Sequence, residues 1–383
     1  MNRDTIYLDY NATTPLDAEV RAAMEPFLGD VYGNPSSVHH VGVAARASVD
    51  AAREKLAAML QCRPTELVFT SGGTESNNLA ILGVARALRD KGNHLVTSQL
   101  EHHAVLECFR YLEKKEGFQV TYLPADREIG VSPSCVLKNI NSNTILVSTM
   151  AANSETGLVF PVQEIGRICR ERGVLFHTDA VQWFGKLNCH AITDFNADLV
   201  SLCAHKLHGP KGIGALYVRS GIPLTPLMMG GGQEGEKRPG TENVSGIIGL
   251  VKAFELFAHP PVFQTKGIPS MTGILLDKIS QIPQIKALKS SIILPNTASF
   301  IVNDITSDVL LAALDLEGIC ASSGSACSSG SLTPSHVLLA LGYTPEEAKS
   351  LLRFSLGRET TLDQVHKVVQ VFPSLIERAR QAQ

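Results

Sequence analysis

Residues 201–212 read SLCAHKLHGPKG and gather two lysines and two histidines directly after a short apolar run. The glycines and the proline are typical of a turn, but a turn does not require His205 and Lys206 side by side. A lysine at this place can act as a nucleophile, because its amine forms a Schiff base with a carbonyl group. Lys206 is the better candidate, since Lys211 lies inside the turn GPKG and is expected to be solvated.

Polar groups also follow three other apolar runs. After ELVFT, Gly73 and Thr74 stand at the start of a helical stretch, where glycine, hydroxyl and free backbone N–H groups suit a phosphate. His102 follows HLVTS, and its imidazole can stack on a flat ring or carry protons. Asp179 follows VLFHT, and a carboxylate that ends a buried strand needs a cationic partner. Taken singly, each of these groups has a structural alternative, either a helix cap or a structural histidine.

The four groups are expected to meet, because open α/β sheets form their sites at the carboxyl ends of their strands. Together they are the groups that pyridoxal 5'-phosphate requires. The lysine forms the Schiff base, and the carboxylate keeps the pyridine nitrogen protonated so that the ring acts as an electron sink. The sequence therefore predicts a pyridoxal-phosphate site with Lys206 as its lysine.

The composition is that of a soluble globular protein with room for two domains, since 44% of its 383 residues are hydrophobic and its net charge is -3. No run rich in lysine and arginine indicates nucleic-acid binding, and no apolar run approaches the roughly 20 residues of a membrane span. We therefore expect a cytoplasmic protein with neither nucleic acid nor membrane as a partner. Eight cysteines without a Cys-x-x-Cys pair predict neither a disulfide framework nor a metal site.

Short apolar runs alternate with helical stretches from ELVFT to GIGALYV, which predicts an α/β fold with a mostly parallel sheet covered by helices. The large domain is expected to span residues 18–257. A Pro-containing connection follows, HPPVFQTKGIPS. Residues 1–17 and 258–383 are expected to form a smaller α+β domain that carries the segment around Cys327.

Motifs spread over nearly the whole chain resemble those of the cysteine desulfurases of the nitrogen-fixation and iron–sulfur-assembly type. These enzymes belong to the class V branch of the aminotransferase-fold enzymes. The resemblance implies a fold type I aminotransferase-like fold, pyridoxal 5'-phosphate as cofactor and L-cysteine as substrate. The motifs that carry it are YLDYNATTPL, GNPSSVH, FTSGGTESNNLAI, EHHAVL, HTDAVQ, AHKLHGPKGIGALYV, RPGTENV, GSACSSGSLTPSHVLLALG and LRFSLGR.

The resemblance also implies a role for each cofactor-binding position. Lys206 would carry the cofactor, His102 would stack on its ring and Asp179 would pair with the ring nitrogen. Gln182 would hydrogen-bond the phenolic oxygen. The implied phosphate contacts are Gly73, Thr74, His205 and, reaching into the neighbouring subunit, Thr241. This last contact implies a homodimer with shared sites.

On the substrate side, the resemblance implies that Arg353 clamps the substrate carboxylate, for which a guanidinium fork is suited. Asn34 lies in a segment that lines the same side. Cys327 stands among small residues and is the implied sulfur acceptor, whose thiolate attacks the sulfur of L-cysteine to give a persulfide and alanine. The long Ser/Gly-rich segment 323–331 resembles that of the group that delivers sulfur to an iron–sulfur scaffold or another acceptor protein.

Two positions depart from the family pattern. Ser154 stands where many members have the second asparagine of Asn-Asn-Glu-x-Gly, which helps to hold the phenolic oxygen. Cys203 stands where a serine commonly donates to the phosphate, and a thiol is a weak donor. Both changes are expected to tune cofactor binding without removing a group that performs chemistry.

Two alternatives to a cysteine desulfurase stay open at this point. One is another pyridoxal-phosphate reaction on the same fold, such as a selenocysteine lyase, which the stretch GGGQEGEKRPGTEN also resembles, or a small-amino-acid aminotransferase. An aminotransferase would have no use for Cys327. The other is a catalytically weakened binding partner in a sulfur-transfer complex, which the changes at Ser154 and Cys203 motivate.

Overall fold

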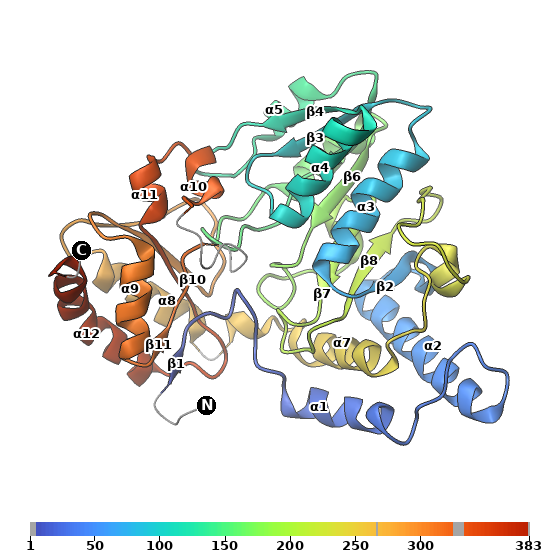
Figure 1. Cartoon of the computed structure of the whole chain (residues 1–383), viewed down its shortest axis with the longest axis horizontal. Coiled ribbons are helices and arrows are strands. Elements are labelled where there is room, and N and C mark those ends of the chain that lie inside the picture. The colour runs from blue at the N-terminus through green and yellow to red at the C-terminus, as the bar shows by residue number, and fades with distance from the viewer. Residues whose placement is uncertain (1–4, 266, 325–332, 382–383) are drawn as a thin grey trace.

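A seven-stranded sheet forms the centre of the larger lobe in this computed structural model, which describes residues 5–265, 267–324 and 333–381 (Figure 1). The strand order is β2-β8-β7-β6-β5-β3-β4, and only β8 runs antiparallel to its neighbours. The predicted α/β fold with a mostly parallel sheet is thereby confirmed. The strands are β2 (Leu67–Thr70), β3 (His94–Ser98), β4 (Gln119–Leu123), β5 (Thr144–Ser148), β6 (Leu175–Asp179), β7 (Leu199–Cys203) and β8 (Gly214–Val218).

Both faces of the sheet are covered by helices, so the inner strands are buried along nearly their whole length. Successive strand residues alternate between two cores. Leu95 of β3 packs in the core that includes α3 and α4, whereas Val96 belongs to the core that includes α2, α6 and α7. The helices of this lobe are α1 (Ala18–Met24), α2 (His40–Leu60), α3 (Gly73–Ala87), α4 (His103–Glu116), α5 (Pro133–Asn139), α6 (Val162–Glu171) and α7 (Val244–Phe257).

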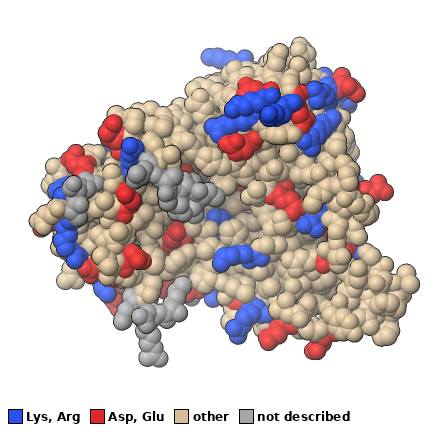
Figure 2. Space-filling model, in the orientation of Figure 1, with Lys and Arg blue, Asp and Glu red and all other residues tan. Residues whose placement is uncertain are grey.

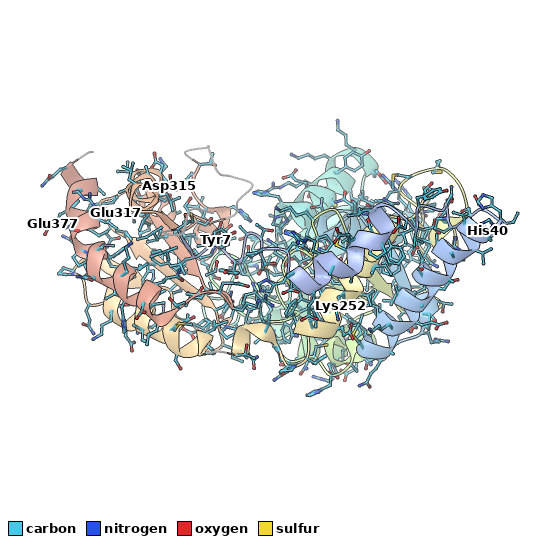
Figure 3. The ribbon with its side chains drawn as sticks, turned by 90° about the horizontal axis from the view of Figure 1, so that it is seen from below. Tyr7, His40, Lys252, Asp315, Glu317 and Glu377 are labelled. Carbon is cyan, nitrogen blue, oxygen red and sulfur yellow. The ribbon has the colours of Figure 1, made fainter. Side chains whose placement is uncertain are left out.

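The smaller lobe is built on a three-stranded antiparallel sheet of order β12-β10-β9. Its strands are β9 (Ile285–Ala287), β10 (Thr297–Val302) and β12 (Leu351–Ser355), and its helices are α8 (Ile268–Ile279), α9 (Ser307–Leu316), α10 (His336–Ala340), α11 (Pro345–Lys349) and α12 (Leu362–Gln381). Short 3-10 helices occur at Glu25–Leu28, Pro64–Glu66, Ile192–Phe195, Gln233–Glu236 and Val262–Gln264. The view from below shows Tyr7, Asp315 and Glu377 at one end of the molecule and His40 at the other (Figure 3).

The N-terminal segment joins the smaller lobe although it precedes the larger one in the chain. Its strand β1 (Ile6–Tyr7) pairs in parallel with β11 (Ile319–Cys320). The backbone N–H of Asn11 donates to Ser355 Oγ, at the end of β12, at 2.9 Å. The segment therefore reaches the space between the two sheets. The domain boundaries at residues 17/18 and 257/258 stay a prediction.

One stretch of the described chain, Val244–Ile279, is long and apolar enough for a membrane span by length and composition, but 67% of its most apolar window is buried inside the protein. This burial is typical of a core helix of a globular protein. Acidic and basic side chains lie close to one another on the face shown in Figure 2. Within residues 5–265, 267–324 and 333–381, no three His, Cys, Asp or Glu side chains gather in a way that could hold a metal ion.

Candidate active site

The carboxyl ends of the parallel strands open onto a pocket of about 240 Å³. Because α3, α4 and the turns after β5, β6 and β7 all begin at this edge, the side chains that follow the strands converge there. The N-terminal segment closes the pocket from the side of the smaller lobe. Of the residues predicted from the sequence, the pocket is lined by Gly73, Thr74, His102, Ser154, Asp179, Gln182, Cys203, His205, Lys206 and Arg353.

The start of α3 has the form of an anion cradle. Gly72 has a φ of 151°, which L side chains rarely adopt, and a Cβ on Gly73 would lie 2.6 Å from Val181 Cγ2. Only glycine therefore lets the backbone pass here without displacing a neighbour. The first N–H groups of a helix have no partner within the helix and carry its positive dipole end, so they attract a phosphate. The cradle and the pocket fit pyridoxal 5'-phosphate.

Lys206 follows β7 and directs its amine at the N-terminal segment. Its Nζ donates to the carbonyl oxygens of Asn11 at 2.6 Å and Ala12 at 2.7 Å. Burial lowers the pKa of Lys206, and the positive charge of Arg353 acts in the same direction. A lowered pKa increases the neutral, nucleophilic fraction of an amine. Lys211, the other candidate, is exposed, as expected.

His102 and Asp179 line the pocket from two neighbouring parts of the sheet. His102 caps α4, and its Nδ1 accepts from the N–H of Ala104 at 3.1 Å, which leaves Nε2 to carry the proton of the neutral ring. Burial lowers the pKa of His102, so the neutral form is favoured. Asp179 accepts from Asn77 Nδ2 at 2.7 Å and from the N–H of Val181 at 3.0 Å.

No lysine or arginine in the described part of the chain forms an ion pair with Asp179, although the side chain is only 7% exposed. The cationic partner expected from the sequence is therefore not a neighbouring residue. A protonated ring nitrogen in the pocket would supply it.

His205 and Cys203 flank the lysine as neutral groups. Burial lowers the pKa of His205 to about 4, and the charges of Lys206 and Lys211 add to the effect. Its Nδ1 lies 3.2 Å from Thr13 Oγ1. Burial raises the pKa of Cys203 to about 11, so its thiol stays protonated and can only be a weak donor.

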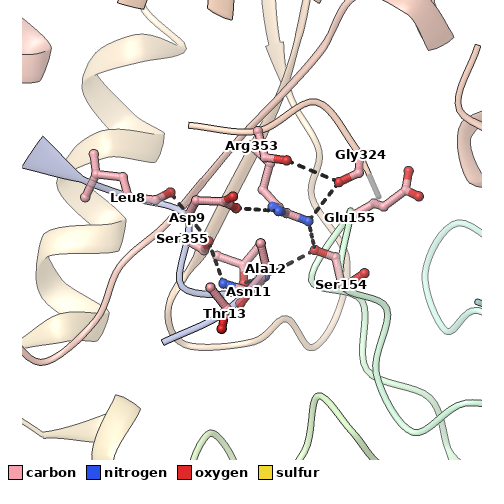
Figure 4. A network of polar contacts seen from close by, with 12 residues as sticks. Leu8, Asp9, Asn11, Ala12, Thr13, Ser154, Glu155, Gly324, Arg353 and Ser355 are labelled. Carbon is pink, nitrogen blue, oxygen red and sulfur yellow. Dashed lines mark hydrogen bonds and ion pairs between the residues drawn. The ribbon is translucent and has the colours of Figure 1, made fainter. Parts of the chain in front are cut away.

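The guanidinium of Arg353 is held in the pocket by an ion pair and by hydrogen bonds (Figure 4). Its side chain is 1% exposed, and Nη2 forms an ion pair with Asp9 Oδ1 at 2.6 Å. Nη1 donates to the carbonyl oxygens of Ser154 at 2.8 Å and Gly324 at 3.0 Å. Among the described residues, Nε has no partner. Arg353 is thus a buried pocket residue rather than part of a surface ion pair, and its contact with a substrate carboxylate stays a prediction.

Two predicted residues do not reach this pocket within one chain. Thr241 is exposed and lines a separate cavity together with Arg238. Asn34 is also exposed, and its Oδ1 accepts from the N–H of Ser36 at 2.9 Å. Cys327, the predicted sulfur acceptor, lies outside the described residues.

Sequence reasoning missed two polar residues that organise the pocket. Asn11 is 1% exposed, lines the pocket and accepts from both Lys206 and Gln182 through its backbone oxygen. Lys186 is fully buried behind Gln182. The only signals were the dense polar content of YLDYNATTPL and a lysine within the largely apolar run AVQWFGKL.

The chain is similar to known proteins over nearly its whole length. Residues 6–368 match the family described as Aminotransferase class-V. Cysteine desulfurase IscS of Dictyoglomus turgidum is 46% identical over 377 residues, which cover 98% of this chain and 95% of that protein. A solved NifS-like protein has a TM-score of 0.89 at 35% identity, over 98% of this chain and 99% of that chain. A structure of SspA in complex with cysteine has a TM-score of 0.82 at 37% identity, over 93% of this chain and 100% of that chain.

Proposed function

The chain belongs to the class-V aminotransferase family, and from this premise we propose that it is a cysteine desulfurase that converts L-cysteine to L-alanine with pyridoxal 5'-phosphate as its cofactor. The observation that supports the proposal best is the single pocket that unites Lys206, Asp179 and His102 with the N-terminus of α3. The similarity to SspA, solved in complex with cysteine, supports L-cysteine as the substrate.

When bound, pyridoxal 5'-phosphate supplies an electron sink for negative charge that develops on the substrate. The residues of the chain hold and polarise it. The backbone N–H groups at Gly73 and Thr74 would bind the phosphate, and Asp179 would hold a proton on the ring nitrogen. His102, whose pKa is lowered by burial, would pack on the ring in the neutral form that this shift favours, without a second positive charge beside the ring.

Lys206 would carry the cofactor, and its amine would serve as the base for the proton on the substrate Cα. Its lowered pKa suits that task, because a neutral amine accepts a proton at Nζ. Arg353 orients the substrate carboxylate. In the absence of substrate, the carboxylate of Asp9 offsets part of the positive charge of the Arg353 guanidinium.

Cys327 takes the sulfur. Its thiolate attacks the substrate sulfur, the carbon–sulfur bond breaks, and the new sulfur–sulfur bond leaves a persulfide on Cys327. The carbon that loses sulfur gains a proton, so one L-cysteine and one thiol give one L-alanine and one persulfide. The persulfide then passes to an iron–sulfur scaffold or another acceptor protein in the cytoplasm.

We further propose a homodimer in which Thr241 completes the phosphate site of the neighbouring subunit. Its exposure and its distance from the chain's own pocket support this role, because a phosphate contact from Thr241 requires a second copy. Mixing inactive Lys206→Ala and Thr241→Val proteins should restore activity through hybrid dimers with one intact site. A fully active monomer at micromolar concentration would exclude shared sites.

The reaction itself is tested by incubating the purified protein with cofactor, L-cysteine and a thiol reductant. Sulfide and L-alanine should appear in equal amounts, and neither should appear with Lys206→Ala. Pyruvate in place of alanine, or turnover of selenocysteine without turnover of L-cysteine, would assign the chain to a different reaction of the same family.

A further inference from the structure

Lys186 is the one fully buried lysine among the residues that the structure describes, and it lies directly behind the pocket. Burial costs a lysine much free energy unless polar groups surround its amine. Burial lowers the pKa of Lys186 well below its usual value, and the positive charges of Lys206 and Arg353 lower it further. Cys203 and Asp9 act in the opposite direction, to a smaller extent.

The amine of Lys186 meets two side-chain amide oxygens and no carboxylate. Its Nζ donates to Asn11 Oδ1 at 2.6 Å and to Gln182 Oε1. The ring of Phe263 lies 5.5 Å away. A neutral amine has two N–H groups, so these two oxygens satisfy both of its donors.

The backbone of Lys186 is fixed as well. Its N–H donates to Trp183 O at 3.0 Å, and its carbonyl accepts from Gln264 Nε2 at 2.9 Å. The amine is therefore presented from a rigid turn, four residues after Gln182. A donor fixed at this place selects between the two flip states of each amide that it touches.

The selected state of Gln182 has a direct consequence for the pocket. With Oε1 turned to Lys186, Nε2 donates one hydrogen to Asn11 O at 3.0 Å. The second Nε2 hydrogen stays available, and Gln182 lines the pocket. The opposite flip would bring Oε1 against the oxygen of Asn11, where neither group can donate, and would remove the acceptor of one Lys186 N–H.

We propose that Lys186 is a positioning residue that fixes the Gln182 carboxamide so that an N–H, and not a carbonyl, faces the phenolic oxygen of the cofactor ring. The proposal rests on pyridoxal 5'-phosphate as the cofactor of the proposed function. A donor at this oxygen weakens its hold on the proton that it shares with the lysine-linked nitrogen. Loss of the donor therefore raises the pH at which the visible band of the bound cofactor titrates.

The test is a double-mutant cycle with Lys186→Met, Gln182→Leu and the double variant, read from the visible absorbance of the bound cofactor as a function of pH. Each single variant should raise the titration midpoint by about one pH unit, because this shift corresponds to the free energy of one hydrogen bond to a charged oxygen. The double variant should show the midpoint of Gln182→Leu alone. Lys252→Met, which removes a lysine on α7 that pairs with Glu255, should leave the midpoint unchanged.

Additive shifts in the double variant, or an unchanged midpoint in Lys186→Met, would overturn the proposal. If Lys186→Met does not fold, the same cycle with Lys186→Leu, which also removes the donor, applies the same criterion. A wild-type protein without a visible band after cofactor addition would instead refute the proposed function. Melting temperatures of the cofactor-free variants separate a general loss of stability from a change at the cofactor.

Discussion

The guanidinium of Arg353 and the carboxylate of Asp9 lie 2.6 Å apart, and they join β12 to the segment that follows β1. Arg353 is 1% exposed, whereas the Asp9 side chain is 19% exposed. One partner is thus buried and the other is partly exposed. The ion pair links the two segments and offsets part of the guanidinium charge of Arg353.

Asp9→Asn should lower the free energy of unfolding by about 3 kcal/mol, because it leaves the buried guanidinium without a countercharge. Urea denaturation measures the loss. Glu171→Gln, which breaks an exposed ion pair with Arg167, is the matched control and should cost less than about 1 kcal/mol. Equal effects of the two changes would show that Asp9 does not carry the charge of Arg353.

Lys206→Ala should abolish turnover, with a loss of about 1000-fold or more, because it removes the amine that is proposed to carry the cofactor and to move the proton. Borohydride reduction of the wild type followed by peptide mapping should find the pyridoxyl group on Lys206. Lys211→Ala should retain the cofactor linkage. A label on Lys211 would reverse the assignment.

Asp179→Asn should keep the shape of the pocket and bind cofactor more weakly. Its turnover should fall by about 100-fold or more, because the charge that holds the proton on the ring nitrogen is lost. Steady-state rates at saturating cofactor measure the effect. Near-normal activity would reduce Asp179 to a structural partner of Asn77.

Cys327→Ser should bind cofactor and L-cysteine normally but make almost no alanine or sulfide, because a hydroxyl does not form a persulfide. Brief exposure of the wild type to L-cysteine without reductant should add one sulfur atom to the Cys327 peptide, detected by mass and removed by a thiol. Selenocysteine is the control substrate. Retained activity on selenocysteine alone would favour a lyase, and wild-type activity on L-cysteine would refute the role of Cys327.

The depressed pKa of His205 makes stability depend on pH. Its pKa is about 4 in the folded protein, below the usual value of a histidine, so the unfolded chain binds the proton more readily between the two values. The stability is therefore complete above about pH 6.5 and is lost as the pH falls toward 4. His205→Gln should reduce this loss in the cofactor-free protein by about 2 kcal/mol between pH 7 and pH 4.5, measured by urea titration. The exposed His366→Gln should not change the slope.

The sequence predicted most of the sheet because its inner strands contain short, largely apolar runs. It missed β4, an edge strand whose residues Gln119–Leu123 are mostly only partly buried and lack that signature. The ligands at the strand ends were predictable because parallel strands bring their carboxyl ends together. The role of Asn11 was not, because it depends on contacts with residues far away in the chain, among them Thr297 and Lys206.

Asn34 and Thr241 show a second limit. Motif resemblance placed both at a ligand site, yet in one chain both are exposed and away from the pocket. A motif can imply that a residue contacts the ligand, but it does not say whether the same copy of the chain or a second copy would supply the contact. The burial of Lys186 could not be predicted from the sequence either, because a lysine within an apolar run does not show which polar groups surround its amine.

The contact between Asn11 and Ser355 spans 344 positions of the chain. During synthesis the N-terminal segment emerges before the larger lobe, yet its partners in β11 and β12 are translated after that lobe. Loop closure over such a distance is slow, and contacts of this kind form late in folding. We therefore expect the carbonyl groups of Asn11 and Ala12, which accept hydrogen bonds from Lys206, to reach their final positions after the central sheet has formed. We expect the nascent chain to gain a cofactor-competent pocket only after β12 has been translated, so that cofactor does not bind at Lys206 before the smaller lobe is present.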